Sequence, residues 1–473
     1  MNWTIAIPEI VLSCIGMAIL LFGVLRKQDS TLPCTMFTLG GFLVAALLVM
    51  TRAYGIGFNG QFVADAFSSF NKVLILAGAA LSAILALDYN RKQQIARFEF
   101  PVLILFSVVG MMVMASAANL MTLYLGLELH SLPLYVLAAF ARDDVRSSEA
   151  GLKYFVLSAL ASGLLLYGIS LVYGFSGTMN FGQLRSLLTQ PANASVGVIV
   201  GVVFVLVGLA FKVSVVPFHM WTPDVYEGAP TPVTVFLSTA PKVAAMSLLL
   251  RVMATPFGHL LGAWQLLIIL VSIASMVLGA LGAIGQSNIK RLMAYSSIGH
   301  MGYALVGLAA GTADGIRGVL IYMVIYVFMT AGAFACIIAM RREGRSTERI
   351  DDLAGLANTD PALALATAVF MFSLAGIPLL SGFFAKLYIF FAAVQAGLWT
   401  LAVIGVLTSV VSAFYYIRIV KVMYFDAPVA AFDPRPASLS FVAAVTGLFT
   451  TFFFLFPGPF VTAAQAAAKA LFS

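Results

Sequence analysis

Long apolar runs, separated by short polar connectors, fill the chain from one end to the other. A helix that crosses a bilayer needs about 20 mostly apolar residues, and fourteen segments of the sequence meet this requirement. The predicted spans cover residues 5–25, 32–50, 66–87, 100–117, 119–140, 154–174, 196–217, 231–252, 260–284, 291–310, 315–340, 361–394, 398–424 and 437–460. Because the connectors are short, we expect an all-α polytopic membrane protein with about 14 transmembrane helices and no soluble domain.

The composition leads to the same fold class. Of the 473 residues, 62% are hydrophobic and 10% are charged, whereas soluble domains contain about 25% charged residues. A water-soluble surface cannot be built from this chain. The formal net charge of +7 could indicate nucleic-acid binding, but basic residues also collect in the cytoplasmic loops of membrane proteins. We therefore expect a lipid bilayer around this chain and no nucleic acid.

The distribution of lysine and arginine predicts how the helices are oriented. Seventeen basic residues lie in or beside the connectors that follow odd-numbered spans, against five on the other side. The larger group comprises Arg26, Lys27, Arg91, Lys92, Arg97, Arg142, Arg146, Lys153, Lys290, Arg291, Arg341, Arg342, Arg345, Arg349, Arg418, Lys421 and Arg435. The smaller group comprises Arg52, Arg185, Arg251, Arg317 and Lys469. Since cytoplasmic loops carry the excess, we expect both termini on the non-cytoplasmic side, and the presence of all fourteen spans favours a bacterial inner membrane.

The remaining four basic residues, Lys72, Lys212, Lys242 and Lys386, fall within predicted spans. A lysine at mid-membrane costs about 2.5–3.5 kcal/mol on insertion scales. Burial shifts the pKa of lysine readily, so a buried lysine can gain and lose a proton, whereas arginine stays charged. These lysines predict a pathway along which protons move from one buried lysine to the next. The alternative is snorkelling, in which the amine reaches the membrane surface; for Lys72 the two interpretations stay equally open.

Two of the lysines lie in interrupted spans. Pro217 follows Lys212 by five residues, and a proline removes a helix hydrogen bond and clashes with the preceding turn. Gly376 and Pro378 interrupt the span that holds Lys386. Broken membrane helices are tolerated where they face protein or a wet cavity, and a corresponding pair of them is typical of inverted-repeat transporters.

The residue spacing favours such a repeat. The interval along the chain from Lys212 to Lys386 is nearly the same as the interval from Glu128 to His300. We therefore expect spans 4–8 to match spans 9–13, with the second copy inverted because each copy holds an odd number of spans. The resulting division is 1–99 for the first three helices, 100–255 for the first repeat, 256–426 for the second repeat and 427–473 for the last helix.

Glu128 is the only acidic residue deep within spans two to fourteen. A buried carboxylate needs a partner, and we predict that Glu128 pairs with Lys212, so that breaking the pair releases the lysine's proton. The alternative is a purely structural ion pair that joins two helices. His130 lies about 200° further round the helix and should face elsewhere. Glu9, near the start of the first span, should lie at the membrane interface.

Lys242 and two histidines are further candidates. Lys242, in span eight, could pass protons between the two halves. His219 follows the first break, and His300 has serine and tyrosine neighbours in sequence. Both histidines are candidate relays because histidine titrates near neutral pH. A histidine that only hydrogen-bonds its neighbours is an equally good interpretation of either residue.

The sequence holds no cofactor motif. Cys14, Cys34 and Cys336 stand singly, without metal-ligand spacing, and the glycine-rich stretches lack phosphate-loop patterns. We therefore expect no cofactor on this chain and any redox chemistry on partner chains.

Several long motifs give the chain a family resemblance. They are IPEIVL, LELHSLPLYVLAAF, EAGLKYFVLSALASGLLLYG, FKVSVVPFHMWTPDVYEGAPTPVTVFLSTAPK, IKRLMAYSSIGHMGY and LAGIPLLSGFFAK. Through them nearly the whole chain resembles the antiporter-like subunits of respiratory complex I, the proton-pumping NADH–quinone oxidoreductase, and most of all its subunit N family. The number of spans and the opening PEI favour N over L, and Lys386 argues against M.

The resemblance implies two inverted five-helix repeats and discontinuous helices seven and twelve. It implies that the buried glutamate of helix five is Glu128. It also implies that the lysines of helices seven, eight and twelve are Lys212, Lys242 and Lys386, and that the histidines of the same hydrophilic axis are His219 and His300. FMN, iron–sulfur clusters and quinone are implied on partner subunits.

The expected function is proton translocation through this buried Glu/Lys/His axis, driven by quinone reduction in partner subunits. The expected partners are the other antiporter-like subunits and the small membrane subunits of complex I. Redox catalysis is then a property of the complex and not of this chain. Two alternatives stay open: a subunit of a multisubunit sodium/proton antiporter, and a passive structural subunit whose polar residues only join helices.

Overall fold

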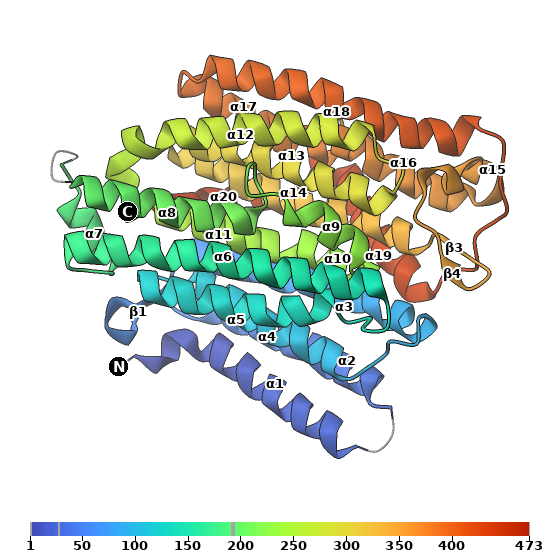
Figure 1. Cartoon of the computed structure of the whole chain (residues 1–473), viewed down its shortest axis with the longest axis horizontal. Helices are drawn as coiled ribbons and strands as arrows, with labels where there is room; N and C mark the ends of the chain where they lie inside the picture. Colours follow the sequence, from blue (N-terminus) through green and yellow to red (C-terminus); the bar gives the residue numbers. More distant parts are fainter. Residues whose placement is uncertain (1, 27–28, 191–193, 473) are drawn as a thin grey trace.

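The computed structural model describes residues 2–26, 29–190 and 194–472, which form a bundle of long α-helices with similar axes (Figure 1). The first half of the bundle contains α1 (Ile7–Leu25), α2 (Thr31–Thr51), α3 (Ala66–Lys92), α4 (Glu99–Ala115), α5 (Leu120–Ala138), α6 (Val145–Ser176), α7 (Phe181–Leu187), α8 (Val196–Val213), α9 (Trp221–Gly228), α10 (Thr231–Ser238) and α11 (Ala240–Ala254). The second half contains α12 (Leu261–Ile284), α13 (Ile289–Ala309), α14 (Ala313–Ile338), α15 (Leu356–Thr359), α16 (Pro361–Ala375), α17 (Ser381–Gln395), α18 (Trp399–Phe425), α19 (Ala437–Phe452) and α20 (Gly458–Lys469).

Two small antiparallel hairpins lie among the connectors. In the first, β1 (Gly55–Gly57) pairs with β2 (Phe62–Ala64), and in the second, β3 (Arg341–Arg342) pairs with β4 (Arg345–Ser346). Short 3-10 turns cover Trp3–Ala6, Phe58–Gly60, Gly258–Leu260, Ile350–Leu353 and Phe453–Leu455. The sequence pattern predicted neither hairpin, because short strands between helices carry no long periodicity.

The predicted spans are confirmed. Eleven helical segments of the described chain are long and apolar enough to cross a membrane. Among the described residues, α4, α13 and the consecutive pair α16–α17 account for the other three of the fourteen predicted spans. The two predicted discontinuous helices are also present, as α8 followed by α9 and as α16 followed by α17.

Three details differ from the prediction. The eighth span is not one straight helix, because Thr239 leaves helical geometry between α10 and α11; Pro241 lacks the N–H that a continuous helix would use here. Helix α6 begins at Val145, well before the expected start at residue 154, because its first turns are polar and exposed. The end of the last predicted span belongs to a separate helix, α20, which begins after Pro457.

Side-chain caps fix where many of the long helices begin. An Asn, Asp, Ser or Thr side chain accepts a hydrogen bond from a free N–H of the first turn, and these N–H groups have no partner within the helix. The capping residues are Asp65, Asn119, Asp144, Ser195, Asn288, Thr312 and Asp360, for α3, α5, α6, α8, α13, α14 and α16.

Small residues let neighbouring helices approach closely. A Cβ atom added to Gly110 of α4 would lie 2.3 Å from the backbone nitrogen of His130 on α5, and one added to Gly279 of α12 would lie 2.6 Å from the backbone nitrogen of Gly299 on α13. Membrane helices associate largely through such close packing, since lipid supplies no hydrophobic drive between them. The pairs α4–α5 and α12–α13 are therefore held by backbone contact that larger residues would prevent.

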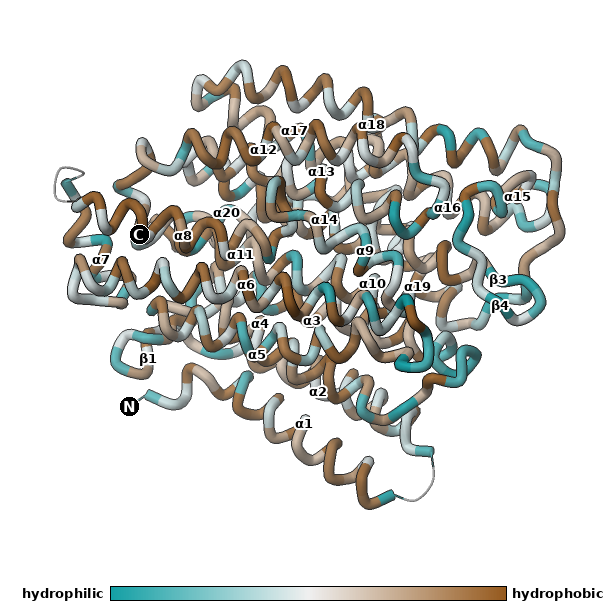
Figure 2. The backbone as a smooth tube through the Cα atoms, in the orientation of Figure 1, coloured by the Kyte–Doolittle hydropathy of each residue, from teal (hydrophilic) through white to brown (hydrophobic). Residues whose placement is uncertain are grey.

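The core runs along the middle of the bundle. The most apolar windows of α10–α11 and of α14 are 100% and 94% buried, compared with 39% for α1 and α2. Apolar residues nevertheless cover the outer helices as well, as Figure 2 shows for α1, α8, α12 and α18. Leu21 of α1 and Leu407 of α18, for example, are 63% and 61% exposed. An apolar outer surface is what a bilayer requires.

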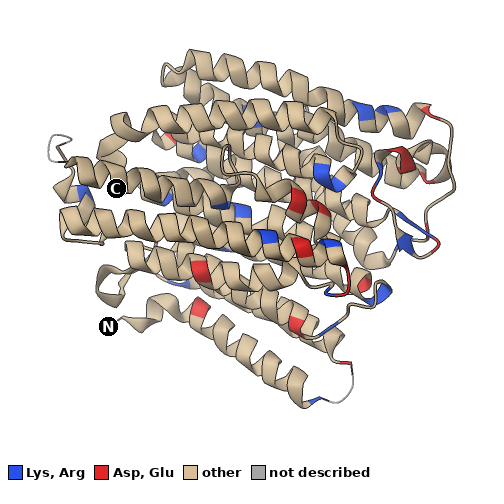
Figure 3. Ribbon diagram, in the orientation of Figure 1, with Lys and Arg blue, Asp and Glu red and all other residues tan. Residues whose placement is uncertain are grey.

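Charged residues gather at one end of the bundle, where the β3–β4 hairpin lies (Figure 3). Here residues from five connectors line one open polar cavity of about 920 Å³, among them Arg97, Arg142, Lys290 and Arg345. These connectors follow the third, fifth, seventh, ninth and eleventh spans, the side on which the distribution of basic residues predicted the excess of charge. Lys27, which that prediction also used, lies outside the described residues.

Candidate functional site

The first break, between α8 and α9, leaves free carbonyl groups inside the bundle. Helix α8 ends at Val213, and Ser214 adopts the left-handed conformation with φ 69°. Residues 214–220 form the connector before α9 begins at Trp221. The last carbonyls of a helix have no partner within it, so the end of α8 is a ready acceptor for buried donors.

Lys212 lies in the last turn of α8 and is 6% exposed. Its Nζ atom donates hydrogen bonds to Ser131 Oγ of α5 at 2.8 Å and to Ser158 Oγ of α6 at 2.6 Å. Tyr135 Oη donates to the same Ser158 Oγ at 2.6 Å. The ammonium group is therefore surrounded by hydroxyl groups from two neighbouring helices.

The predicted pairing of Glu128 with Lys212 is not a direct ion pair, although the two groups lie close enough to interact electrostatically. Among the described residues no ion pair involves Glu128, and its buried Oε1 atom has no hydrogen-bond partner. Ser131 lies three residues after Glu128 on α5, and residues at this spacing share one helix face. The carboxylate thus lies one turn from the serine that the lysine contacts. The hydroxyls of Ser131 and Ser158 bind the lysine where the carboxylate was expected.

Lys242, near the start of α11, is bound to the same break. The side chain is 1% exposed, and Nζ donates to Val213 O at 3.0 Å and to Ser214 Oγ. The ring of Trp221 lies 5.2 Å from Nζ, within the range of a cation–π contact. Lys242 therefore satisfies the free end of α8, at the residue that directly follows Lys212.

Lys386 lies at the second break. Helix α16 ends at Ala375, Gly376 takes φ 90°, and α17 begins at Ser381. Lys386 Nζ donates to Leu374 O at 3.3 Å and Ala375 O at 2.9 Å, and to Ser409 Oγ of α18 at 2.7 Å. Like Lys242, it satisfies the free carbonyls of a broken helix.

The two breaks correct the expected equivalence of Lys212 and Lys386. Lys212 precedes its break on α8, whereas Lys386 follows its break on α17. Lys242 binds the end of α8 in the same way that Lys386 binds the end of α16. The interval between Lys212 and Lys386 therefore does not relate equivalent positions.

The interval along the chain from Glu128 to His300 recurs between the acceptors of two similar hydrogen bonds. Ser107 of α4 donates to the carbonyl of His130 on α5 at 2.9 Å, and Ser272 of α12 donates to the carbonyl of Gly302 on α13 at 2.7 Å. Gly302 follows His130 by the same interval that separates His300 from Glu128. In both helix pairs, α4–α5 and α12–α13, a serine of the first helix thus donates to a carbonyl of the second, and the acceptor residues keep this interval.

His300 lies in α13 and is 3% exposed. Its Nδ1 atom lies 2.6 Å from Tyr322 Oη of α14, and its Nε2 atom lies 3.2 Å from Tyr416 Oη of α18. Tyr416 Oη in turn lies 2.5 Å from Ser296 Oγ, one turn earlier on α13. His300 is therefore the centre of a chain of hydroxyl groups from three helices.

His219 and His130 differ from what the sequence predicted. His219, in the connector between α8 and α9, is half-buried, and its Nδ1 atom has no hydrogen-bond partner in the described chain. His130, expected to face elsewhere, is 2% exposed, and its Nδ1 atom lies 3.1 Å from Ser131 Oγ. Since Ser131 also contacts Lys212, His130 belongs to that cluster.

Lys72 and Glu9 form a separate buried ion pair. Lys72 Nζ lies 2.6 Å from Glu9 Oε1, and the two side chains are 3% and 5% exposed. Snorkelling of Lys72 is therefore wrong, because its amine is buried against Glu9, whereas the interfacial position of Glu9 stays a prediction. The pair joins α1 to α3.

The hydroxyl groups that complete the clusters were missed by the sequence analysis. Ser131, Ser158, Ser214, Ser409 and Tyr416 each contact a buried lysine or His300. Single serines and tyrosines are common in membrane helices, so nothing in the sequence distinguishes these from the rest. Among the described residues no group of three or more His, Cys, Asp and Glu side chains is placed to hold a metal ion.

Comparisons with known proteins agree with this architecture. The family model described as NADH:quinone oxidoreductase/Mrp antiporter, TM matches residues 117–412. A relative from Granulibacter bethesdensis, named NADH-quinone oxidoreductase subunit N, is 65% identical over 476 residues, which is 100% of each chain.

Solved structures match as well. A chain of respiratory complex I from Thermus thermophilus superposes with a TM-score of 0.84 at 34% identity, covering 97% of this chain and 99% of that one. A chain of the Mrp complex from Dietzia sp. reaches a TM-score of 0.87 at 23% identity, covering 100% and 98% of the two chains, and this likeness shows the fold alone. A family match over more than half of the sequence, together with full-length identity of this degree, establishes that the chain belongs to the NADH-quinone oxidoreductase subunit N family, the antiporter-like membrane subunits of complex I.

Proposed function

We propose that this chain translocates protons across the bacterial inner membrane through Glu128, Lys212, Lys242 and Lys386. His300 and His219 are the candidate relays of this axis. The observation that carries the proposal is that each of the three lysines is buried at or beside a helix break, with a serine hydroxyl within hydrogen-bond distance of its amine. Snorkelling lysines would reach the surface instead.

The serine contacts support reversible protonation. A charged lysine donates hydrogen bonds, and a neutral amine can accept one from a hydroxyl group, since serine is both donor and acceptor. The hydrogen bonds therefore persist in either protonation state after the hydroxyl rotates. Glu128, one helical turn from Ser131, supplies the charge that favours a proton on Lys212 when the carboxylate is ionised.

The energy for transport comes, in this proposal, from the partner subunits. Moving one charge against 100 mV costs about 2.3 kcal/mol. Quinone reduction, with FMN and iron–sulfur clusters on other chains of complex I, supplies it. The partners are the other antiporter-like subunits and the small membrane subunits. The division into repeats over 100–255 and 256–426 belongs to the same proposal, supported by one break in each.

The test is Lys212→Ala in the whole complex, reconstituted into vesicles. We expect an assembled complex whose proton pumping and quinone turnover both fall at least tenfold. Lys421→Ala is the matched control, because Lys421 pairs with Asp426 at the exposed end of α18. Normal pumping by the assembled Lys212→Ala complex would refute the proposal. Loss of assembly would favour a structural role, and Glu128→Gln, which keeps the side-chain shape, then shows whether the pH dependence of turnover changes.

A second candidate, a subunit of a sodium/proton antiporter, shares the fold of the Mrp complex. The 65% identity to a subunit N favours complex I. Proton pumping that requires sodium in the buffer would support the antiporter, and pumping unaffected by its removal would support complex I.

A further inference from the structure

Helix α9 is short, and a break separates it from α8. It has eight residues and follows the irregular connector of residues 214–220. Because no continuous ladder of helix hydrogen bonds joins α9 to α8, the position of α9 depends on the groups that hold it from the side. The ring of Trp221, its first residue, lies 5.2 Å from Lys242 Nζ. Whatever fixes α9 therefore also fixes this contact with the proposed axis.

Lys290, in the first turn of α13, binds the far end of α9. Its Nζ atom donates to Glu227 O and to Ala229 O, both at 2.8 Å. The last carbonyls of a helix have no partner within it, and a cation beside them also complements the helix dipole. Lys290 is 2% exposed, so its charge is withdrawn from water to make this contact.

Glu348 completes the site of Lys290. Its Oε1 atom lies 3.1 Å from Lys290 Nζ, and its Oε2 atom accepts from Asn288 Nδ2 at 3.0 Å. The backbone carbonyl of Glu348 accepts from Ile289 N at 2.8 Å. A lysine ammonium has three donors, and here two carbonyls and one carboxylate accept from them. The amine of Lys290 is therefore held in one place.

Other ion pairs hold the side of α9. Arg291 Nη1 donates to Asp224 Oδ1 at 2.8 Å and to Glu227 Oε2 at 2.9 Å, and Lys153 of α6 donates to Asp224 Oδ2 at 2.7 Å. The side chains of Arg291 and Lys153 are 31% and 41% exposed, compared with 3% for Lys290. Exposed ion pairs contribute little, whereas a buried charge is costly to separate from its partners. The contact with Lys290 therefore holds α9 more firmly than the exposed pairs do.

The other end of α9 packs against the proposed axis. Trp221 Nε1 donates to Phe211 O at 3.1 Å, and Phe211 directly precedes Lys212 in the last turn of α8. A shift of α9 at Lys290 would therefore move Trp221 relative to Lys242 and to the end of α8.

We propose that Lys290 is a positioning residue of the proton axis, which holds α9 so that Trp221 stays against Lys242. The proposal rests on the proposed function. An aromatic ring favours the charged form of a lysine beside it, so the position of Trp221 affects how readily Lys242 gives up its proton. Lys290 keeps its own proton during transport, because a carboxylate and two carbonyls accept from its amine.

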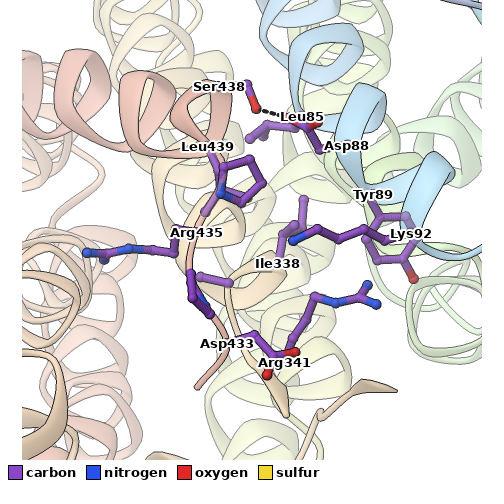
Figure 4. A pocket seen from close by; sticks show the side chains of 13 residues that line it. Leu85, Asp88, Tyr89, Lys92, Ile338, Arg341, Asp433, Arg435, Ser438 and Leu439 are labelled. Carbon is purple, nitrogen blue, oxygen red and sulfur yellow. Dashed lines mark hydrogen bonds between the residues drawn. The ribbon is translucent and has the colours of Figure 1, made fainter. Parts of the chain in front are cut away.

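The test compares variants of the whole complex reconstituted into vesicles: Lys290→Met, Lys290→Arg, Glu348→Gln and the control Lys92→Met. Methionine removes the charge, whereas arginine keeps hydrogen-bond donors but does not release a proton. Lys92 is the matched control, because it is exposed at the same charged end of the bundle. There it lines a small pocket between the end of α3 and residues 433–436, to which α9 contributes no residue (Figure 4).

We expect Lys290→Met to pump protons about tenfold more slowly, which corresponds to the loss of one hydrogen bond to a charged group. Its pH profile of pumping around neutral pH should also shift, because Trp221 no longer stays against Lys242. Lys290→Arg and Lys92→Met should pump near the wild-type rate. The pH profile is the decisive measurement, since a merely structural lysine would change how much complex assembles and not the pH profile of the assembled complex.

An unchanged pH profile in the assembled Lys290→Met complex overturns the proposal. An assembled Lys290→Arg complex that pumps as slowly as Lys290→Met also overturns it, since Lys290 would then carry protons itself. If either Lys290 variant does not assemble, Glu348→Gln decides by the same shift in pH profile, because glutamine keeps the side-chain shape and removes the charge beside Lys290. Lys212→Ala, measured in parallel, separates this proposal from the proposed function. Slow pumping by Lys212→Ala with wild-type behaviour of Lys290→Met refutes the positioning role alone, and normal pumping by Lys212→Ala refutes both.

Discussion

Serine hydroxyls accompany all three buried lysines of the proposed axis, whereas Lys72, also buried, pairs with a carboxylate. Lys212 contacts two serines, and Lys242 and Lys386 contact one each together with free backbone carbonyls. Lys72 lies 2.6 Å from Glu9 instead. A close buried ion pair holds its charge in place and is costly to break. The residue contacts therefore distinguish the lysines suited to exchange a proton from the one that joins two helices.

Ser158→Ala tests this distinction at a single hydroxyl. Ser158 Oγ accepts from both Lys212 and Tyr135, so its removal leaves two buried donors without this partner. A hydrogen bond to a charged group is worth about 1.5 kcal/mol or more, and we expect proton pumping to slow roughly tenfold. Pumping rates in vesicles provide the measurement.

Ser162→Ala is the control for this variant. Ser162 lies one turn further along α6, is 6% exposed, and its hydroxyl has no hydrogen-bond partner in the described chain. The control should pump at the wild-type rate. Equal slowing in both variants would show that packing of α6, and not the contact with Lys212, sets the rate.

At the scale of elements, the break between α16 and α17 depends on Gly376. Its φ of +90° is a conformation that side chains disfavour, and an added Cβ would lie 3.0 Å from Lys386 Nζ. We expect Gly376→Ala to destabilise the protein by roughly 1–2 kcal/mol through backbone strain and to slow turnover by displacing Lys386. Thermal unfolding and quinone turnover of the purified complex are the two measurements.

Gly285→Ala provides the comparison for that prediction. Gly285 ends α12 with φ −82°, and a Cβ there meets nothing within 4 Å. We expect no loss of stability. If the two alanine variants behave alike, the geometry of the break is not what requires glycine at position 376.

The contact between Asp65, which precedes α3, and Arg251 in the last turn of α11 should depend on pH. Asp65 precedes α3, and Arg251 donates to its two carboxylate oxygens at 2.9 and 2.8 Å. Burial raises the pKa of Asp65, but the Arg251 guanidinium and the hydrogen bonds from Ser68 outweigh it and hold the pKa below the usual 3.8. A carboxyl with a lowered folded pKa stabilises the fold above its unfolded pKa, and the stabilisation is lost as the pH falls through the folded value.

We therefore expect the melting temperature to fall on acidification below 3.8, in part through this pair. Asp65→Asn should lower stability by about 3 kcal/mol at neutral pH and remove that part of the acid dependence. Melting curves across this pH range, with the 96% exposed Asp143 replaced by Asn as control, provide the check. An unchanged acid dependence in Asp65→Asn would assign it to other carboxylates.

The elements also show what sequence could and could not predict. Apolar run length located the fourteen spans, and Pro217 and Gly376 located two breaks, because both signals are local. The bend at Thr239 was missed although Pro241 stands beside it, since proline near a helix start and proline at a bend look alike in sequence. A direct Glu128–Lys212 contact was expected, but charge complementarity does not reveal that two serines from other helices bind the lysine.

At the scale of the whole molecule, the buried lysines and histidines discussed for the proposed axis form two clusters. Lys212, Lys242 and His130 surround the break after α8, whereas Lys386 and His300 lie in the second half with Tyr416. Helix α13, which carries His300, packs against both α9 and α17. Proton transfer along the membrane plane would therefore pass beside α13.

The distribution of charge over the molecule makes a last prediction about orientation. Seventeen basic residues belong to the connectors after odd-numbered spans and five to the other side, and Figure 3 shows the charges gathered at one end of the bundle. Basic loops stay in the cytoplasm, so we expect both termini on the non-cytoplasmic side.

Alkaline phosphatase fused to either terminus should be active, and a fluorescent protein fused there should be dark. The same reporters inserted beside Asp143, which is 96% exposed at the charged end, should behave in the opposite way. Termini that report from the cytoplasm, or from different sides, would contradict the even number of spans or the orientation drawn from the basic residues.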